Sequence, residues 1–355
     1  MGTVRAVLLH TPLTSRLARR LRGRLDVADV CVRAVEVSPA VQVPPAPAPT
    51  YDAAELDRIT GCTEWSTLED NLAWLRGTTE YGAAMAYELP PVWFVDGNFA
   101  RGRFRFEMNT SRERLLVRSG DLPEYDGAAF VSSAFGNRFF GHQLLDDLAT
   151  AVLGPAFGDP YYVNRRDAVS EHVKAYRQLT NLDHPIAWSG RATGCWVFRD
   201  AFLNDSKVDR IHELRQRLAA AVPHHDGPAR RVFIRRGDIG AQRAPRNEPE
   251  LERSLADDGW LVLDPLSTPL PDLLGAFAGA DIVAGPEGSQ LAPVLHAIPI
   301  GATLLLLCPP QRFNLYYKEF CDRLGIRLAF HIGLARGEEW DVDIDAVRRL
   351  IDSVE

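Results

Sequence analysis

The stretch that decides the fold covers residues 230–310 and reads RRVFIRRGDIGAQRAPRNEPELERSLADDGWLVLDPLSTPLPDLLGAFAGADIVAGPEGSQLAPVLHAIPIGATLLLLCPP. Short apolar runs alternate in it with amphipathic segments that are long enough to form helices. The runs predict strands at 231–236, 260–264, 281–284 and 302–308, and a fifth strand follows at 327–332. Continuously apolar strands that alternate with helices are typical of a parallel sheet covered on both faces. The fold class expected for this part of the chain is therefore α/β.

Two arginines, Arg235 and Arg236, end the first predicted strand. Further polar residues follow in the loop behind it: Arg243, Arg246 and Asn247. Parallel sheets bind ligands at the carboxyl ends of their strands, and guanidinium groups bind phosphate oxygens through paired hydrogen bonds. The arginines therefore predict a phosphate-binding edge. The alternative is structural, with Arg235 paired to Asp238 or to a carboxylate on a neighbouring helix.

The turn after the third predicted strand, GPEGSQ at 285–290, adds a second polar segment to this edge. Gly288 lets a ligand approach the backbone, and a helix predicted at 288–296 offers free N–H groups to an anion. Glu287 would repel phosphate and instead accept hydrogen bonds from ribose or sugar hydroxyls. The turn has neither a Walker A lysine nor a GxGxxG pattern. The residues expected to form this ligand site are Arg235, Arg236, Arg243, Arg246, Asn247, Gly285, Glu287, Gly288, Ser289 and Gln290.

A helix predicted at 141–152 is the second focus of the chain. At about 100° per residue its leucines share one face, which predicts an amphipathic helix. His142 and Asp146 are four residues apart, and we expect them to be neighbours at the polar margin of that face. A histidine steadied by a carboxylate is a candidate general base. The alternative is that His142 only caps or packs the helix start.

The bulk composition is that of a soluble globular protein. With 355 residues, 46% of them hydrophobic and 25% charged, the chain is expected to form two domains. The net charge of −7 argues against a dedicated nucleic-acid binder. Its five cysteines are scattered and show no CxxC spacing, which fits reduced cytosolic thiols. No apolar run reaches the length of a transmembrane helix, so none is expected.

The N-terminal segment is rich in arginine and lacks the order of a signal peptide. Its arginines are able to touch an anionic membrane surface. The simpler interpretation is a strand at 4–9 followed by a basic surface helix at 16–24. We expect a cytoplasmic protein, with peripheral membrane contact as the second possibility. The oligomeric state does not follow from the sequence.

Two segments contain residue types that bind metals, but neither predicts a metal site. Asp341 and Asp343 precede a helix predicted at 341–354, where acidic residues commonly cap. His224 and His225 lie in a linker with proline and glycine, where adjacent histidines are usually exposed to solvent. No metal ligands are therefore expected.

Three stretches resemble segments of glycosyltransferase family 61, which includes bacterial capsular-polysaccharide, eukaryotic O-GlcNAc and plant xylan transferases. Residues 137–146 resemble its N-x-G-H-W-L-x-D segment, 233–248 its I-S-R-R-D…R-x-x-x-N-E segment and 277–291 its F-x-x-A-x-x-V-x-G-x-H-G-A-x-L segment. The matching positions are Gly141, His142, Leu144, Asp146, Arg235, Arg236, Arg243, Asn247, Glu248, Phe277, Ala280, Val283, Gly285, Gly288 and Leu291. The resemblance covers residues 131–310, about half of the chain.

This chain departs from the family pattern in five places. Gln143 replaces an aromatic residue, and Asn137 and Asp238 are displaced along the sequence. Glu287 stands where the family has a histidine, and the following strand, LLLLCPP, lacks the usual acidic residue. The last two changes put the donor chemistry, the sugar or the activity itself in doubt.

The resemblance implies a GT-B-like fold, in which two Rossmann-like domains face a cleft. It implies an N-terminal acceptor-side domain at 1–225, a nucleotide-sugar domain at 226–335 and a C-terminal helix at 336–355. The implied activity is inverting, metal-independent transfer of a sugar from a nucleotide sugar, with a UDP-sugar as the expected donor, to a hydroxyl acceptor. His142 and Asp146 would be catalytic, and no further cofactor is expected. The alternatives are a non-catalytic nucleotide-sugar-binding protein and another nucleotide-sugar enzyme, such as an epimerase.

Overall fold

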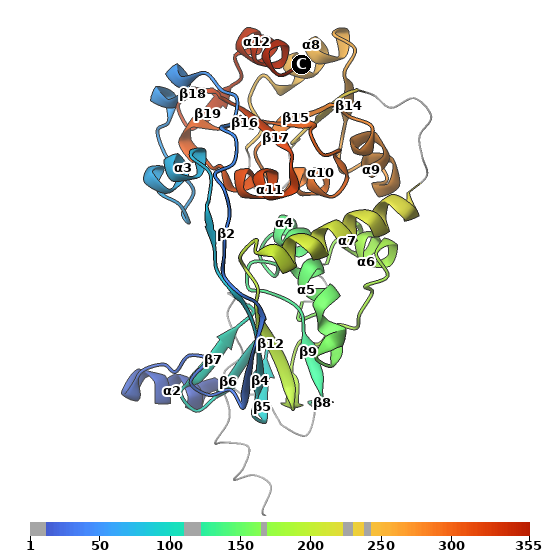
Figure 1. Cartoon of the computed structure of the whole chain (residues 1–355). Coiled ribbons are helices and arrows are strands. Elements are labelled where there is room, and N and C mark those ends of the chain that lie inside the picture. Colours follow the sequence, from blue (N-terminus) through green and yellow to red (C-terminus); the bar gives the residue numbers. More distant parts are fainter. Residues whose placement is uncertain (1–11, 110–121, 165–168, 223–229, 238–242) are drawn as a thin grey trace, which may run out of the picture. The chain divides into compact units, whose positions relative to one another are not determined.

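A computed structural model describes residues 12–109, 122–164, 169–222, 230–237 and 243–355 (Figure 1). The chain divides into two compact units, and each is built from two stretches of sequence. Unit 1 comprises Met1–Ala40 and Gly82–Leu214, and unit 2 comprises Val41–Tyr81 and Arg215–Glu355. The fold class is mixed α/β, as predicted.

Unit 2 contains the predicted parallel sheet. Its strand order is β14-β13-β15-β16-β17, and every neighbouring pair is parallel. The strands are β13 (Arg231–Ile234), β14 (Leu261–Leu263), β15 (Ile282–Pro286), β16 (Thr303–Cys308) and β17 (Arg327–Ile332). All five were predicted from their apolar runs, and the inner strand β16 is buried along its whole length.

Helices cover both faces of this sheet (Figure 1). On one face lie α8 (Glu248–Asp257) and α12 (Ile344–Val354), which share a core with Leu305 and Leu307 of β16. On the other lie α9 (Leu270–Ala278), α10 (Ala292–Ala297) and α11 (Tyr316–Leu324). The C-terminal helix is therefore part of the unit 2 core, whereas the sequence predicted a separate segment at 336–355.

Residues 41–81 also belong to unit 2, although the sequence placed them in the N-terminal domain. Thr50 pairs with β17, since its N–H donates to the Leu328 carbonyl at 2.9 Å and its carbonyl accepts from the Phe330 N–H at 3.0 Å. The Glu55 carboxylate accepts from His331 Nδ1 at 2.7 Å and from the Ile332 N–H at 2.8 Å. These contacts span more than 270 residues, so no local pattern predicts them. The elements of this stretch are β2 (Val41–Gln42), the 3₁₀ helix η1 (Ala53–Arg58), α3 (Leu68–Leu75) and β3 (Glu80–Tyr81).

Unit 1 is built on two five-stranded sheets, with the orders β1-β4-β12-β9-β10 and β7-β6-β5-β11-β8. Pairs β1–β4 and β4–β12 are antiparallel, whereas β12–β9 and β9–β10 are parallel. The strands are β1 (Arg33–Ser38), β4 (Ala84–Leu89), β5 (Val92–Val95), β6 (Asn98–Arg101), β7 (Phe104–Glu107), β8 (Glu124–Asp126), β9 (Ala128–Phe130), β10 (Asp159–Tyr161), β11 (Gly190–Thr193) and β12 (Cys195–Arg199). The expectation of a second Rossmann-like domain is wrong for this unit, because its sheets are mixed.

Aromatic side chains join the two sheets of unit 1. Phe130 of β9 packs against Phe94 of β5 and Phe99 of β6, with ring centroids 5.1 and 4.9 Å apart. The turn between β5 and β6 lies at Asp96 and Gly97, both with positive φ, as the hairpin geometry requires. In the part of the chain that the structure describes, no helix is both long enough and apolar enough to cross a membrane.

Candidate functional site

The helix that carries His142 is not a regular α-helix. It begins as α4 (Phe140–His142), continues as a π-helical turn, η3 (Gln143–Asp147), and ends as α5 (Leu148–Leu153). The Leu148 N–H donates to the Gln143 carbonyl, a bond that spans five residues. Single π turns inside helices are frequent at functional sites. The sequence predicted a helix here but not its widened turn.

The structure brings His142 and Asp146 together, with His142 Nδ1 2.5 Å from Asp146 Oδ2. The imidazole also stacks on Phe135, with ring centroids 5.2 Å apart, and its side chain is 23% exposed. Because an ionised carboxylate can only accept, Nδ1 carries the proton, and Nε2 of the neutral ring holds the lone pair that a base needs. The geometry is that of a histidine oriented by a carboxylate.

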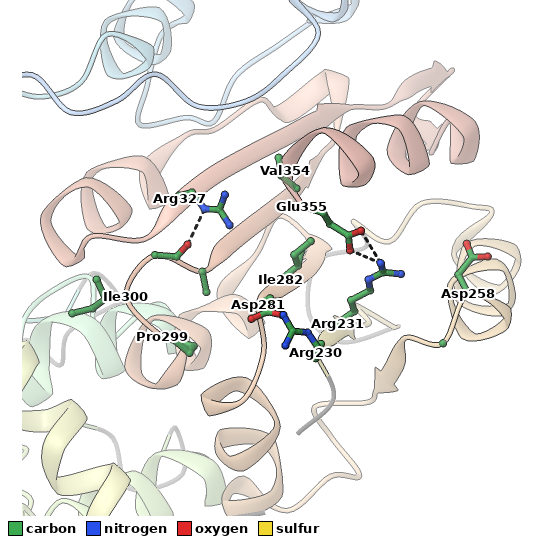
Figure 2. A pocket seen from close by; sticks show the side chains of 13 residues that line it. Arg230, Arg231, Asp258, Asp281, Ile282, Pro299, Ile300, Arg327, Val354 and Glu355 are labelled. Atoms are coloured by element: carbon green, nitrogen blue, oxygen red, sulfur yellow. Dashed lines mark hydrogen bonds and ion pairs between the residues drawn. The ribbon is translucent and has the colours of Figure 1, made fainter. Parts of the chain in front are cut away.

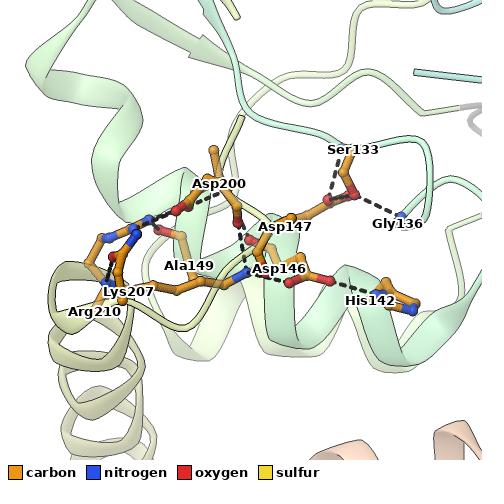
Figure 3. A network of polar contacts seen from close by, with 12 residues as sticks. Ser133, Gly136, His142, Asp146, Asp147, Ala149, Asp200, Lys207 and Arg210 are labelled. Carbon is orange, nitrogen blue, oxygen red and sulfur yellow. Dashed lines mark hydrogen bonds and ion pairs between the residues drawn. The ribbon is translucent and has the colours of Figure 1, made fainter. Parts of the chain in front are cut away.

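Asp146 is held on its other side by a buried lysine (Figure 3). Lys207 Nζ forms an ion pair with Asp146 Oδ1 and donates to the Asp200 carbonyl at 2.8 Å, and Lys207 is fully buried. Arg210 in turn binds the Asp200 carboxylate through two hydrogen bonds of 2.6 and 2.9 Å. We call these five residues the histidine cluster. Lys207 and Arg210 lie on α7 (Asp205–Ala221), far from the π turn in the sequence.

Two adjacent carboxyl groups in this helix have opposite protonation behaviour. Burial opposes ionisation of Asp146, but the Lys207 charge and the His142 hydrogen bond outweigh it and lower the pKa of Asp146 to about 2. Burial, together with the charge of Asp146, raises the pKa of Asp147 to about 8, although hydrogen bonds from Ser133 lower it. At neutral pH Asp146 is therefore ionised and able to stabilise a protonated His142, whereas Asp147 is mostly neutral.

In unit 2, Arg236 lies at the carboxyl edge of the sheet. Its Nη1 donates to Gln290 Oε1 at 2.5 Å, and Gln290 Nε2 donates to the Pro286 carbonyl at 2.5 Å. The buried Glu248 carboxylate accepts from the backbone N–H groups of Arg236, at 2.7 Å, and Gly237, at 3.1 Å. Arg236 is thus fixed on the turn that follows β15, at the edge of the sheet where the sequence placed the strand-end arginines.

Three guanidinium groups gather around Glu287. Burial lowers the pKa of Arg236 and of Arg243, and the positive charge of Arg312 lowers both further. The buried Glu287 carboxylate forms an ion pair with Arg312 and accepts from Asn314 Nδ2 at 3.2 Å. With Gln290, these residues form what we call the arginine cluster, in which three arginines face one carboxylate. It retains a surplus of positive charge. Both Glu287 oxygens have partners within the protein, and its role as a ribose or sugar ligand stays a prediction.

Other predicted donor-binding residues have structural partners. Arg235 Nε lies 3.2 Å from Glu252 Oε1, and its Nη1 lies 3.9 Å from Asp264 Oδ2, in agreement with the structural alternative. Arg246 pairs with Asp341 at 3.0 Å, and the Asn247 side chain bonds both the N–H and the carbonyl of Val342, each at 2.9 Å. These contacts tie the loop to the segment before α12.

The glycine turn differs in part from its prediction. The expected helix at 288–296 is divided into a 3₁₀ turn, η6 (Ser289–Leu291), and the six-residue helix α10. A long helix therefore does not begin at Gly288, and the argument from helix N–H groups does not hold. Gly285 and Gly288 still have a steric role. A Cβ at Gly285 would lie 2.6 Å from the Ile234 carbonyl oxygen, and one at Gly288 would collide with the Arg236 guanidinium.

Two important residues were missed by sequence reasoning. Arg312 follows the strand at 303–308, and residues that follow parallel strands lie at the ligand-binding edge of the sheet. The sequence could therefore have indicated it. Lys207 gave no such signal, because it lies 61 residues from Asp146 and near the start of an ordinary amphipathic helix.

A cavity of about 860 Å³ opens at the opposite edge of the unit 2 sheet (Figure 2). It is lined by the amino-terminal ends of β13, β15, β16 and β17. Its charges are paired: Arg231 with Glu355 at 2.5 Å, Arg230 with Asp281, and Arg327 with the Gly301 carbonyl at 2.8 Å. Ligands of parallel sheets bind at the carboxyl ends, so this cavity is a weaker candidate than the arginine cluster.

Within the described ranges, no set of three or more His, Cys, Asp or Glu side chains is arranged to hold a metal ion. Asp343 caps α12 by accepting from the Ala346 N–H at 3.0 Å, as predicted. Asp341 pairs with Arg336 at 2.8 Å as well as with Arg246. His224 and His225, like Asp238, lie outside the described residues.

Comparison with known proteins identifies one family. Residues 140–303 match the family model described as glycosyltransferase 61, and the match includes both His142 and the arginines at the carboxyl edge of β13. No curated protein matches. Among solved structures, the dodecameric iron-containing heptosyltransferase TibC in complex with ADP-D-β-D-heptose aligns over 77% of this chain and 94% of its own. Its identity of 12% and TM-score of 0.31 are too low to carry an argument.

Proposed function

We propose, from the premise that residues 140–303 belong to glycosyltransferase family 61, that this protein transfers a sugar from a nucleotide sugar to a hydroxyl acceptor. The observation that carries the proposal is the arginine cluster at the carboxyl edge of the parallel sheet. Its three guanidinium groups outnumber the two carboxylates beside them, Glu287 and Glu248, and the remaining positive charge suits the negative diphosphate of a nucleotide sugar. The repulsion among the arginines is relieved when such an anion binds.

In this proposal, unit 2 binds the nucleotide-sugar donor. Arg236, Arg243 and Arg312 would bind the diphosphate oxygens, and Gln290 would keep Arg236 in place through their 2.5 Å hydrogen bond. Bond cleavage concentrates charge on the leaving diphosphate, and fixed guanidinium groups stabilise that charge. This supports transfer without a metal. We expect a UDP-sugar to be the donor.

Unit 1 is assigned the acceptor chemistry. The acceptor hydroxyl gives its proton to His142 Nε2, and its oxygen forms a bond to the anomeric carbon. The bond from that carbon to the diphosphate oxygen breaks, and its electron pair leaves with the nucleoside diphosphate. A single displacement of this kind inverts the anomeric carbon. The ionised Asp146 stabilises the imidazolium that forms, and Lys207 holds Asp146 in place.

Calorimetry with UDP-, GDP-, CMP- and dTDP-sugars, followed by assays of nucleoside diphosphate release with a panel of acceptors, tests the proposal. We expect one nucleotide family to bind and to be consumed only when a suitable acceptor is present. Failure of every nucleotide sugar to bind would contradict the proposal. An isomerised nucleotide sugar as the product would indicate an epimerase instead.

A second candidate function is nucleotide-sugar binding without catalysis. It is favoured by Glu287, which replaces the family's histidine and is buried in an ion pair with Arg312. Binding that is never followed by turnover, with any acceptor, would support this alternative. Restoring the histidine as Glu287→His would then be expected to produce activity if the substitution alone had silenced the enzyme.

A further inference from the structure

Helix α2 (Pro12–Arg22) lies beside β6 and β7 of unit 1 (Figure 1). Its polar side makes the attachment. Ser15 is buried, and its Oγ donates to the Gly102 carbonyl at 2.7 Å, at the turn between β6 and β7. Arg103 Nη1 donates to the Arg22 carbonyl at 2.6 Å. The helix ends at Arg22, and Gly23, which follows it, has a φ of 77°. Leu25 then forms an isolated β-bridge to Phe104 of β7. Both ends of the helix are thus fixed on the β6–β7 hairpin.

This attachment turns Leu17 and Leu21 of α2 outward. At about 100° per residue, Leu17 lies about 160° and Leu21 about 120° from the buried Ser15. Leu17 is 51% exposed and Leu21 is 81% exposed. A surface helix of a globular protein normally buries its apolar stripe and exposes its polar side. The orientation of α2 is the reverse, so its leucine stripe has no partner among the described residues.

Arginines surround the exposed leucines. Residues 12–25 contain five arginines, and β6 and β7 with their turn contain three more. Across both segments the one acidic residue is Glu107, which pairs with Arg105 at 2.7 Å. Arg16 and Arg20 are exposed and border Leu17 on the helix. The whole chain carries a net charge of −7, so this basic region reverses the prevailing charge.

We infer that α2 and the β6–β7 hairpin dock the protein on an anionic lipid bilayer. The leucines enter the boundary between headgroups and acyl chains, and the arginines contact lipid phosphates. An apolar stripe bordered by basic residues is the pattern of helices that lie in a membrane interface. A second copy of the chain fits less well, because apposed α2 helices would bring two sets of arginines together. The inference is independent of the proposed catalytic function.

Co-sedimentation of the full chain with lipid vesicles tests the inference. We expect binding to phosphatidylcholine vesicles that contain phosphatidylglycerol, little binding to phosphatidylcholine alone, and weaker binding as salt is raised. The variant Leu17→Ser/Leu21→Ser should bind anionic vesicles about ten-fold or more weakly, since it loses the inserted apolar surface. Arg16→Gln/Arg20→Gln should weaken binding by about ten-fold.

Leu266→Ser is the matched control, because Leu266 is 67% exposed in unit 2 and should not affect vesicle binding. All substituted side chains are exposed, so circular dichroism and the melting temperature should be unchanged. The inference is overturned if the wild-type chain does not bind anionic vesicles at low salt, or if the double leucine variant binds as tightly as the wild type. A dimer that depends on Leu17 and Leu21, without vesicle binding, would also overturn it and identify a second copy as the occupant.

Discussion

The histidine cluster of unit 1 and the arginine cluster of unit 2 use buried charge in opposite ways. In the histidine cluster, Lys207 and Arg210 are matched by Asp146 and Asp200, so the buried charges are neutralised within the protein. In the arginine cluster, three guanidinium groups share Glu287 and keep a surplus of positive charge. The charges of the first cluster are balanced within the protein, whereas those of the second are not.

The difference indicates separate tasks. A neutralised, fully bonded network fixes geometry, and it leaves His142 as the group at its end that can exchange a proton. A network with a surplus of positive charge binds anions. Because its arginines repel one another, it favours a multivalent anion such as a diphosphate. Substitutions in the first cluster should therefore affect turnover and stability, and those in the second should affect ligand binding.

His142→Ala should produce the largest effect on turnover. Loss of a general base typically reduces the rate by about 10²–10⁴-fold. Nucleotide-sugar affinity, measured by calorimetry, should change little, because the arginine cluster is intact. His212→Ala, on α7 of the same unit, is the control and should retain activity. Wild-type turnover in His142→Ala would remove His142 from the mechanism.

Lys207→Met should be the most destabilising change. It leaves the carboxylate of Asp146 buried without its ammonium partner, which costs about 3–5 kcal/mol in free energy of unfolding. Urea unfolding measures the loss. Lys174→Met is the matched control, because Lys174 forms an exposed pair with Glu171 and should change stability by less than about 1 kcal/mol. Equal stability of the two variants would contradict a structural charge at Lys207.

The variants Arg236→Gln and Arg235→Gln distinguish the roles of two adjacent arginines in nucleotide-sugar binding. Arg236 belongs to the arginine cluster, so its loss should weaken nucleotide-sugar binding by about 10–100-fold. Arg235 pairs with Glu252, away from that cluster, and its loss should weaken binding by less than about three-fold. Calorimetry with the identified donor gives both values. The reverse order of effects would show that Arg235 is the donor-binding residue.

Asp147→Asn should change the pH dependence of stability. The folded pKa of Asp147, about 8, lies above its unfolded value, so the folded state holds the proton longer. Wild-type stability should therefore fall as pH rises from about 4 to 8. Asparagine mimics the neutral acid and should remove most of that fall. Urea unfolding at several pH values measures it, and parallel curves for the two proteins would contradict the raised pKa.

Local sequence was sufficient to predict much of the fold. Each of the strands β13 to β17 is a continuous apolar run, because helices cover both faces of their sheet. Such runs alternating with helices are typical of a parallel sheet, so the sequence predicts both the strands and their direction. The pair His142 and Asp146 was also predictable, because four residues along a helix bring side chains together whatever the rest of the chain does. The family match lies within the region whose motifs suggested it.

Tertiary structure decided what depends on contacts between distant residues. Arg235 and Arg236 follow β13 directly, and only the tertiary packing determines that Arg235 pairs with Glu252 and Arg236 with Gln290. Lys207 reaches Asp146 from another helix, and Arg312 reaches Glu287 from beyond the next strand. The sequence by itself determined the parallel sheet and the two polar segments at its edge. The three-dimensional packing decided which of their charges are neutralised, because the energy of a buried charge depends on its partners in space.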